Sequence, residues 1–429
     1  MLEILLPTAL LLVLLTLGTP VGFAMIVTGL LGIAMIWGPD AGLALLATGP
    51  RAATQSFTMT AIPLFILMAE FLGASTVIRQ MFGTARAWLG RLPGGLAVAS
   101  VGAGAGMGAL SGSSIAATAS LAGTTVPEMR KSGYSEKLAL GAVASAGTLA
   151  PMIPPSLVLI IYGVTTETSI ADLFTAGIIP GLVLAFLYCL VIAGWQLLRP
   201  EIAPKGPKVS WSERFRSLTG TAPALLLIAL VLGGIYSGLV TATEAGALGA
   251  LGALVVGAAF GGLRREGIVR AMRRTIELTA TLFIIIIGAK LFTQYVTLTG
   301  MTQSLSQFVQ DAGFPPLLII LIIMLVYIAL GAFLDSAGMM LLTLPVFFPL
   351  VVGLGYDPVW FGILVALTCE VGLLSPPVGM NVYVTVASGG GRLGDGFRGV
   401  TPFYGACLVM ALLLVAFPDI ATFLPSLSE

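Results

Sequence analysis

The sequence predicts an all-α polytopic membrane protein built from two inverted-topology repeats, each with a re-entrant helical hairpin and a broken transmembrane helix. Three observations predict this fold: the composition, the register of proline and glycine, and the placement of basic residues. Of the 429 residues, 57% are hydrophobic and only 9% are charged, whereas soluble domains carry about 25% charged residues. Apolar runs near twenty residues, the length that crosses a bilayer, recur along the chain.

The first apolar run, residues 2–17, carries Glu3 and no basic residue, so we expect a retained span rather than a signal peptide. Further spans are expected near 22–38 and 57–78. The chain has no histidine, which excludes bis-histidine haem ligation, histidine-based zinc chemistry and a histidine proton relay. The cysteines form no pairing motif and are expected to be buried, inert thiols: Cys189, Cys369 and Cys407. These observations argue against a membrane enzyme or electron-transfer subunit.

Residues 92–127 are expected to form the first hairpin. Basic clusters flank this segment on both sides, so it enters and leaves through the cytoplasmic face. Helices over 95–110 and 115–127 would be about 24 Å and about 20 Å long. Both fall short of the ~30 Å hydrocarbon core. A re-entrant hairpin with its tip, SGSS (Ser111–Ser114), at mid-membrane is therefore favoured, with two short spans as the alternative.

A shift of 222 residues aligns the backbone-breaking residues of the two halves. Proline and glycine set chain geometry, so their register implies a repeated shape. The matched positions are Pro127 with Pro349, Gly133-Tyr134 with Gly355-Tyr356, and Pro154-Pro155 with Pro376-Pro377. Residues 128–137 are basic, whereas their counterpart has no basic residue, so the two loops are expected on opposite sides of the membrane.

The expected organisation follows from this register. The first repeat covers residues 1–198, with its hairpin at about 92–127 and its broken helix at about 138–165. A cytoplasmic linker, 199–219, leads to the second repeat, 220–429, with its hairpin at about 314–350 and its broken helix at about 359–387. Spans near 221–239, 245–262 and 276–298 match the first three, and Arg264–Thr275 is expected to form an interfacial arm. Inverted repeats with broken helices are typical of secondary transporters.

Each half carries a hairpin tip and, about forty residues further on, a Pro-Pro break. The first pair is SGSS and GTLAPMIPPS, and the second is LDSAG and CEVGLLSPPVG. Pro-Pro removes two amide donors and leaves free carbonyls, which are tolerated at membrane depth only beside protein or a cavity. Carbonyls and hydroxyls suit a weakly held Na⁺, and half-helix N-termini suit an anion. Ser111, Ser113 and Ser114 are expected to act as ligands, although close packing of small residues would also explain them.

Few charges lie within the apolar segments. Lys290 is mid-span, which makes it a functional candidate. It either attracts a substrate carboxylate or pairs with Glu70, Asp335 or Glu370. Asp335 and Glu370 lie beside the second tip and break, so either could add negative charge to a cation site.

Several long strings resemble the large membrane subunit of tripartite ATP-independent periplasmic (TRAP) transporters: SGSSIAATASLAGTTVPEMRKSGY, IPPSLVLIIYGVTTETSIADLFTAGIIPG, and TLPVFFPLVVGLGYDPVWFGIL followed by SPPVGMNVYV. The resemblance covers essentially the whole chain. It implies an elevator-type secondary transporter of the bacterial inner membrane that imports an organic acid, such as a C4-dicarboxylate, keto acid or sugar acid, on a sodium gradient. It also implies two partners: a small membrane subunit as a separate chain and a periplasmic substrate-binding protein. No organic cofactor or nucleic acid is expected.

The resemblance further implies the ligands. Sodium would be bound by Ser111, Ser113, Ser114, Gly147 and Pro151 in the first half, and by Gly331, Asp335, Gly372 and Ser375 in the second. Substrate would lie between the tips, near Ser113, Ser114, Lys290, Asp335, Ser336 and Asn381. Ser375 stands where the family commonly has threonine and keeps the hydroxyl. A stand-alone sodium–dicarboxylate symporter with the same plan is the main alternative, and a passive channel is another.

Overall fold

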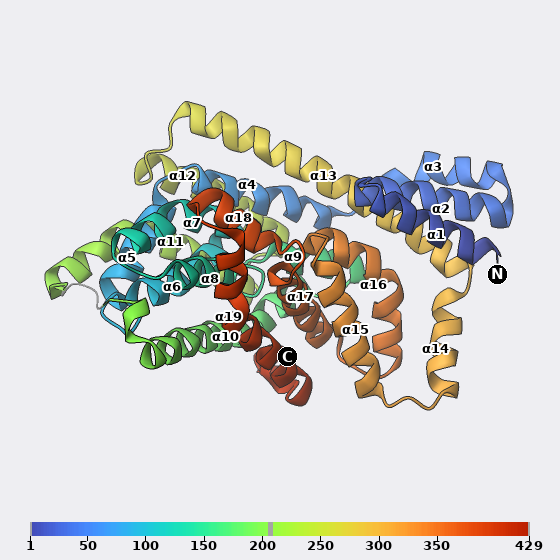
Figure 1. Cartoon of the computed structure of the whole chain (residues 1–429). Coiled ribbons are helices and arrows are strands. Elements are labelled where there is room, and N and C mark those ends of the chain that lie inside the picture. Colours follow the sequence, from blue (N-terminus) through green and yellow to red (C-terminus); the bar gives the residue numbers. More distant parts are fainter. Residues whose placement is uncertain (1, 205–208, 428–429) are drawn as a thin grey trace.

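The structure, a computed structural model that describes residues 2–204 and 209–427, contains helices and connecting segments in that part of the chain (Figure 1). The first half comprises α1 (Leu2–Thr16), α2 (Val21–Trp37), α3 (Pro39–Thr54), η1 (Phe57–Thr60), α4 (Ala61–Gly73), α5 (Val77–Leu89), α6 (Gly95–Ser111), α7 (Ser114–Lys131), α8 (Glu136–Gly147), α9 (Leu157–Thr166), α10 (Ile170–Leu198) and η2 (Pro200–Ile202). The second comprises α11 (Trp211–Tyr236), α12 (Ala242–Ala259), α13 (Arg265–Leu298), α14 (Met301–Asp311), α15 (Pro316–Gly331), α16 (Ser336–Gly353), α17 (Pro358–Leu374), α18 (Met380–Gly389), α19 (Leu393–Ala416), α20 (Asp419–Thr422) and η3 (Pro425–Leu427).

Six helices in the described residues are long and apolar enough to cross a membrane: α10, α11, α12, α13, α16 and α19. The pair formed by α3 and Phe57–Gly73, bent by 67°, would make a seventh. Several shorter apolar helices, including α6 and α15, fall below the length of a full span. The predicted all-helical, multi-pass fold class is confirmed.

The two halves repeat one order of elements, and their helix caps keep the register. Ser113 and Asp335, which are 222 residues apart, are the N-caps of α7 and α16, the second helices of the two hairpins. Ser135 and Asp357 have the same separation and cap α8 and α17. Each side-chain oxygen accepts a hydrogen bond from a backbone amide in the first turn, which satisfies a donor that the helix cannot pair. In the repeat, α2 corresponds to α12 and α4 corresponds to α13. Each helix packs on the partner of the other, since α2 contacts α13 and α4 contacts α12.

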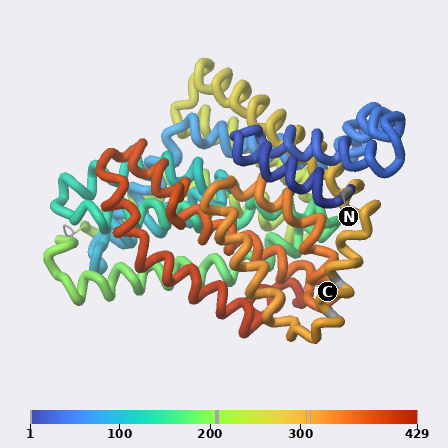
Figure 2. The backbone as a smooth tube through the Cα atoms, turned by 45° about the vertical axis from the view of Figure 1, so that its right-hand side comes forward, coloured from blue at the N-terminus to red at the C-terminus, as the bar shows by residue number. Residues whose placement is uncertain are grey.

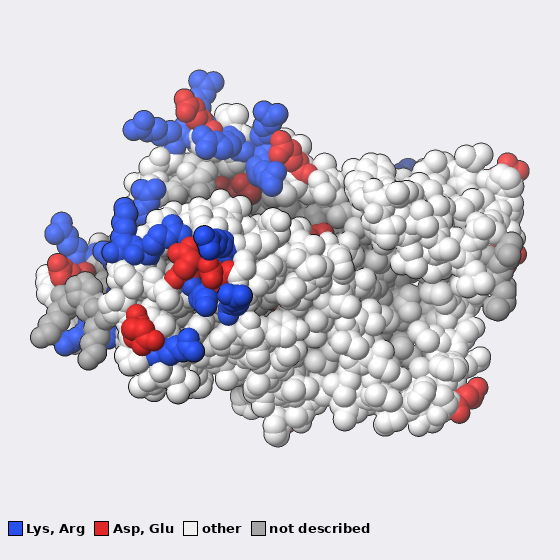
Figure 3. All heavy atoms as spheres, viewed as in Figure 1, with Lys and Arg blue, Asp and Glu red and all other residues white. Residues whose placement is uncertain are grey.

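The two hairpins lie at opposite ends of the molecule. Figure 1 shows α6 and α7 toward the left and α15 and α16 toward the right. Lys and Arg side chains gather over the left part of the same face, whereas the charges visible at the right-hand end are mostly acidic (Figure 3). The positive-inside rule assigns the basic end to the cytoplasm. Figure 2 brings both ends of the chain to the side away from this basic end.

Two predicted boundaries need correction. Helix α7 continues through Pro127 to Lys131, and α16 likewise contains Pro349, so these prolines lie inside helices rather than ending them. The linker is shorter than the predicted 199–219 because α11 begins at Trp211, where Ser210 and Glu213 form a capping box. Residues 205–208 of that linker lie outside the described residues.

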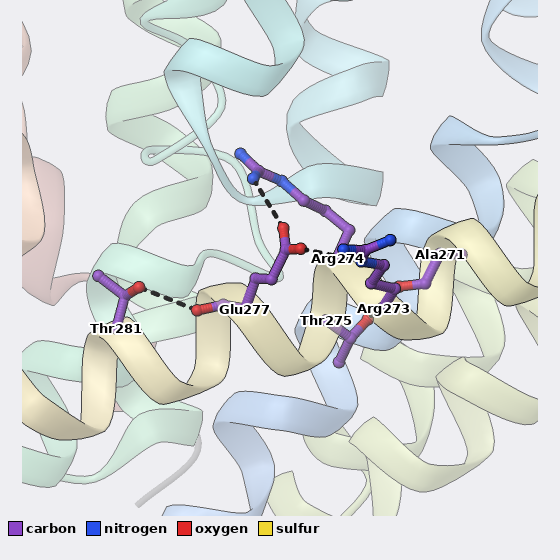
Figure 4. A network of polar contacts seen from close by, with 6 residues as sticks. All are labelled: Ala271, Arg273, Arg274, Thr275, Glu277 and Thr281. Atoms are coloured by element: carbon purple, nitrogen blue, oxygen red, sulfur yellow. Dashed lines mark hydrogen bonds and ion pairs between the residues drawn. The ribbon is translucent and has the colours of Figure 1, made fainter.

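The segment Arg264–Thr275, which was expected to form an interfacial arm, does not form an element of its own. This segment is the beginning of α13, which continues without a break for 34 residues. Arg273 and Arg274 pair with Glu277 at 3.3 Å each, and the hydroxyl of Thr281 donates to the Glu277 carbonyl (Figure 4). These pairs lie three and four residues apart, the spacing that stabilises a continuous helix.

Glycines let the hairpin helices pack so closely on neighbouring helices that the two backbones are in contact. A Cβ placed on Gly104 of α6 would lie 2.5 Å from the Ala146 carbonyl oxygen of α8. In the second half, a Cβ on Gly372 of α17 would lie 2.6 Å from the Gly331 Cα of α15. Real Cβ atoms do not approach backbone so closely, so these helix pairs depend on the absence of a side chain.

Gly372→Ala is expected to lower the midpoint of thermal unfolding in detergent, because the added methyl must push α15 away from α17. Overpacking of this kind costs about 1–3 kcal/mol. The matched control is Gly405→Ala in α19, where a Cβ would meet nothing within 4 Å. That variant should be as stable as the parent or slightly more so, because alanine favours helix over glycine. Equal midpoints for the two variants would contradict the prediction.

Candidate functional site

The first hairpin tip lies directly against the first helix break. Gly112, between α6 and α7, has a φ of 58°, a left-handed conformation that glycine adopts readily. Its carbonyl accepts a hydrogen bond from Leu157 N, at the start of α9, at 3.3 Å. A Cβ on Gly112 would lie 2.6 Å from that same nitrogen. The tip and the break therefore touch through backbone, as the sequence predicts for SGSS and the Pro-Pro break.

Oxygen atoms collect where α7 passes the end of α8. A Cβ on Gly147 would lie 1.8 Å from Thr118 Oγ1 and 3.0 Å from the Ser114 carbonyl oxygen. The Thr118 hydroxyl is buried and has no hydrogen-bond partner among the described residues. In the break that follows, no backbone amide of the described chain donates to the carbonyls of Ala150–Pro155. This set of neutral oxygens fits a sodium ion, for which unwound backbone carbonyls are typical ligands in transporters.

The second break has the same character. Ser375 is the C-cap of α17, and its hydroxyl donates to the Val371 carbonyl at 2.9 Å. No backbone amide of the described chain donates to the carbonyls of Ser375–Val378. The backbone contact of Gly331 with Gly372 holds the end of α15 against this region.

A buried carboxylate lies between the two tips. Glu370 of α17 is 0% exposed, and its Oε1 accepts a hydrogen bond from Ser336 Oγ at 3.0 Å. The side chains of Ser114, in the first hairpin, and Asn381, after the second break, also interact with this carboxylate. Three of the predicted substrate ligands are thus brought together: Ser114, Ser336 and Asn381.

The structure does not bring Lys290 to this place. Lys290 is exposed and forms no ion pair among the described residues, so of the two alternatives for it the structure contradicts pairing with Glu70, Asp335 or Glu370 and leaves attraction of a substrate carboxylate. It lines a cavity of about 750 Å³ formed by residues 52–59, 163–171, 235–242 and 286–293, with Leu341. None of the hairpin-tip residues lines this cavity. Lys290 therefore belongs to a separate compartment that both halves enclose, and it is the only basic residue in the lining that the structure describes.

The remaining predicted ligands have local roles in the structure. Ser113 and Asp335 use a side-chain oxygen as an N-cap, at 3.5 Å from Ala116 N and 3.3 Å from Gly338 N respectively. The Ser111 hydroxyl donates to the Ser113 carbonyl at 3.4 Å. Pro151 is buried within the first break. Each of these residues is at a tip or a break, and a capping oxygen keeps lone pairs for a further partner.

Thr118 is the main residue that the sequence prediction missed, whereas Glu370 was expected beside the second break but not between the two tips. Thr118 is one helical turn after Ser114, and this spacing places both residues on the face of α7 toward α8. No group of three or more His, Cys, Asp and Glu side chains that could hold a metal ion is found in the described ranges. The oxygen atoms at the two tips and breaks that could bind a cation are mainly hydroxyls and carbonyls. Such ligands suit an alkali metal ion rather than a transition metal.

Two opposed hairpins, each resting on a broken helix at the centre of a multi-pass helical bundle, define a secondary transporter of the inverted-repeat class. The chain matches the family model described as "Tripartite ATP-independent periplasmic transporter, DctM component" over residues 8–420. It belongs to this family, as the resemblance predicted, and is the large permease of a TRAP transporter, a multi-pass protein of the bacterial inner membrane.

Named relatives agree with this assignment. The chain is 36% identical over 374 residues to the C4-dicarboxylate TRAP transporter large permease protein DctM of Pseudomonas aeruginosa, covering 87% of each chain. It is 31% identical to the sialic acid TRAP transporter large permease protein SiaM of Vibrio cholerae, over 96% of this chain and 95% of that protein. The crystal structure of the Alcanivorax borkumensis YdaH transporter matches with a TM-score of 0.64 at 16% identity, covering 89% of this chain and 90% of that chain. This last likeness shows a shared fold.

Proposed function

We propose that this chain imports an organic acid into the bacterial cytoplasm and drives the uptake with an inward sodium gradient. The observation that carries the proposal is the convergence of both hairpin tips and a helix break on one buried set of oxygens around Ser114, Ser336 and Asn381. Sodium would bind at the two breaks, near Gly147 with Thr118 and near Gly372 with Ser375. The acid would bind between the tips, where the N-termini of α7 and α16 favour negative charge.

The names of the relatives support a carboxylate substrate. Besides C4-dicarboxylate and sialic acid, they include a 2,3-diketo-L-gulonate permease of Escherichia coli, 32% identical, and an ectoine permease of Halomonas elongata, 30% identical. All of these compounds carry a carboxylate group, although they differ in size and in their other groups. The carboxylate is therefore the feature that the central site of this chain should recognise.

The mechanism that we propose is of the elevator type. The reciprocal pairs α2–α13 and α4–α12 would form the scaffold. Helices α6–α10 and α15–α19, which contain both tips and both breaks, would move as the transport domain. A small membrane subunit, as a separate chain, and a periplasmic substrate-binding protein would complete the transporter, as the family name implies.

Uptake into liposomes tests this proposal. The chain would be reconstituted with its small subunit, and a binding protein loaded with a radiolabelled C4-dicarboxylate, keto acid or sugar acid would be added outside. We expect an inward sodium gradient to raise the initial rate at least tenfold over equal sodium on both sides. Sodium-independent uptake would contradict the coupling. Full uptake without the binding protein would favour the stand-alone symporter instead.

A further inference from the structure

The Glu370 carboxylate is only partly satisfied by the residues around it. Ser336 supplies one hydrogen bond to Oε1, whereas Oε2 is buried without a hydrogen-bond partner in the described part of the chain. Four ion pairs are found among the described residues, and none of them includes Glu370. A carboxylate in a dry interior is costly unless its charge is compensated.

Asn381 has the same deficit. Its side chain is 0% exposed and lies close enough to interact with Glu370, yet neither its amide nitrogen nor its amide oxygen makes a hydrogen bond of normal length and angle among the described residues. An amide that is buried without any partner is rare, since buried polar groups are nearly always paired. Glu370 Oε2 and both amide atoms of Asn381 are therefore free to bind a shared ligand.

No basic side chain of the described residues is found to interact with Glu370. The other ionisable groups that interact with Glu370 are Tyr188 on α10, Cys369 on α17 and Cys407 on α19. Asp335, at the second tip, interacts with Cys369 and adds a further acidic group nearby. None of these groups can carry positive charge. The N-termini of α7 and α16 supply only partial positive charge, and no basic side chain among the described residues balances the carboxylate.

The first repeat shows that the fold does not require an acid here. The 222-residue register aligns Glu370 with Thr148. The Thr148 hydroxyl donates to the Ser145 carbonyl at 2.7 Å and lies 2.6 Å from the Tyr188 hydroxyl, so its polar group is satisfied. The first repeat thus has a neutral, fully hydrogen-bonded side chain at this position, whereas the second repeat has a carboxylate that is only partly hydrogen-bonded.

We propose that Glu370 and Asn381, together with the hydroxyls of Ser114 and Ser336, form a further sodium site between the two hairpin tips, next to the bound acid, where the ion would offset the charge that Glu370 places beside the substrate carboxylate. It adds to the two sites at the helix breaks, the first of which also lies beside Ser114 through the carbonyl of that residue, and it rests on the proposed sodium coupling. The carboxylate supplies the charge, and the amide and hydroxyl oxygens complete the ligand set. Because Ser114 begins α7 and Ser336 begins α16, an ion bound here joins the first hairpin to the second.

The number of sodium ions moved with each substrate tests this site. It is obtained from the membrane potential at which net uptake is zero, measured in liposomes at several sodium gradients. Glu370→Gln keeps the size of the side chain and removes the charge, so we expect the sodium count to fall by one. The matched control is Glu213→Gln, which removes an exposed carboxylate at the cytoplasmic end of α11 and should leave the count unchanged.

A binding measurement without transport provides a second readout. Sodium chloride should raise the unfolding temperature of the detergent-solubilised parent protein when it replaces choline chloride at constant ionic strength. For Glu370→Gln we expect the sodium concentration at half-maximal stabilisation to rise at least tenfold. If this variant does not accumulate, Glu370→Asp takes its place: it keeps the charge on a shorter side chain, so the sodium count should persist while the half-maximal concentration rises at least threefold.

Two results would overturn the proposal. One is an unchanged sodium count in Glu370→Gln with a parent that is sodium-driven, which would make Glu370 a neutral hydrogen-bonding group. The other is an unchanged half-maximal sodium concentration in Glu370→Gln or Glu370→Asp. A parent protein whose uptake ignores sodium would instead contradict the proposed function, so the two failures are distinguishable.

Discussion

We expect Gly112→Ala to reduce substrate uptake at least tenfold in reconstituted liposomes, while the protein still accumulates in the membrane. The substitution acts in two ways. Alanine is disfavoured at a φ of 58°, by about 1–2 kcal/mol. In addition, its methyl would lie 2.6 Å from Leu157 N, so the first tip must withdraw from the first break. Withdrawal separates the tip from the carbonyls of Ala150–Pro155, which are the proposed sodium ligands.

Gly355→Ala is the matched control for this experiment. Gly355 lies between α16 and α17, has a φ of 85°, and has nothing within 4 Å of the position of an added Cβ. Gly355→Ala therefore has the free-energy cost of placing alanine at a positive φ, but its methyl group meets no neighbouring atom. We expect it to lose some thermal stability and to keep most of its uptake. If both variants lost uptake to the same degree, contact between tip and break would not explain the effect.

We expect Lys290→Glu to raise the KM for an anionic substrate at least tenfold at low ionic strength. Lys290 is the basic residue that lines the cavity of about 750 Å³, so charge reversal replaces attraction by repulsion of an entering carboxylate. At an effective dielectric constant of about 20, two unit charges about 7 Å apart interact by about 2 kcal/mol, which is sufficient for such a change. KM is measured from initial uptake rates at increasing concentrations of the loaded binding protein.

Salt and a conservative variant control this second experiment. Lys290→Arg keeps the charge and should keep KM within about threefold. Raising the ionic strength screens the cavity, so the difference between Lys290→Glu and the parent should shrink. A KM that does not respond to charge reversal would mean that substrate does not pass through this cavity.

The parts of the fold that depend on local chemistry could be predicted from sequence. The tips, the Pro-Pro breaks and the second hairpin follow from proline, glycine and capping residues, whose effects reach only a few residues along the chain. Helix α3 (Pro39–Thr54) was not predicted, because its uncharged run is bounded by Asp40 on one side and by Pro50 and Arg51 on the other and is too short for a span. The continuity of α13 was not predicted either, because the basic composition of its first turns indicates a surface location without excluding a straight helix.

The residues of the candidate site also fall into those that local sequence identifies and those that depend on helix packing. Ser114, Ser336 and Asn381 could be named from motifs at a tip or a break, and the structure places all three around Glu370. Lys290 was named from its position in an apolar run, but which neighbours such a residue meets depends on how helices pack. The role of Thr118 also depends on packing, because only the close approach of α7 to Gly147 brings its hydroxyl to the break.

The unbroken length of α13 fixes how deeply the Lys290 cavity lies in the bilayer. At 1.5 Å per residue, this helix of 34 residues is about 51 Å long, more than the ~40–45 Å of a whole bilayer with its headgroups. Arg274 and Lys290 are therefore about 24 Å apart along one rigid axis. The arginines at the start of α13 must stay at the cytoplasmic headgroups. In a thicker membrane α13 should therefore change its tilt or its depth, and the cavity should shift relative to the outer surface. Uptake should accordingly depend on the acyl-chain length of the lipids.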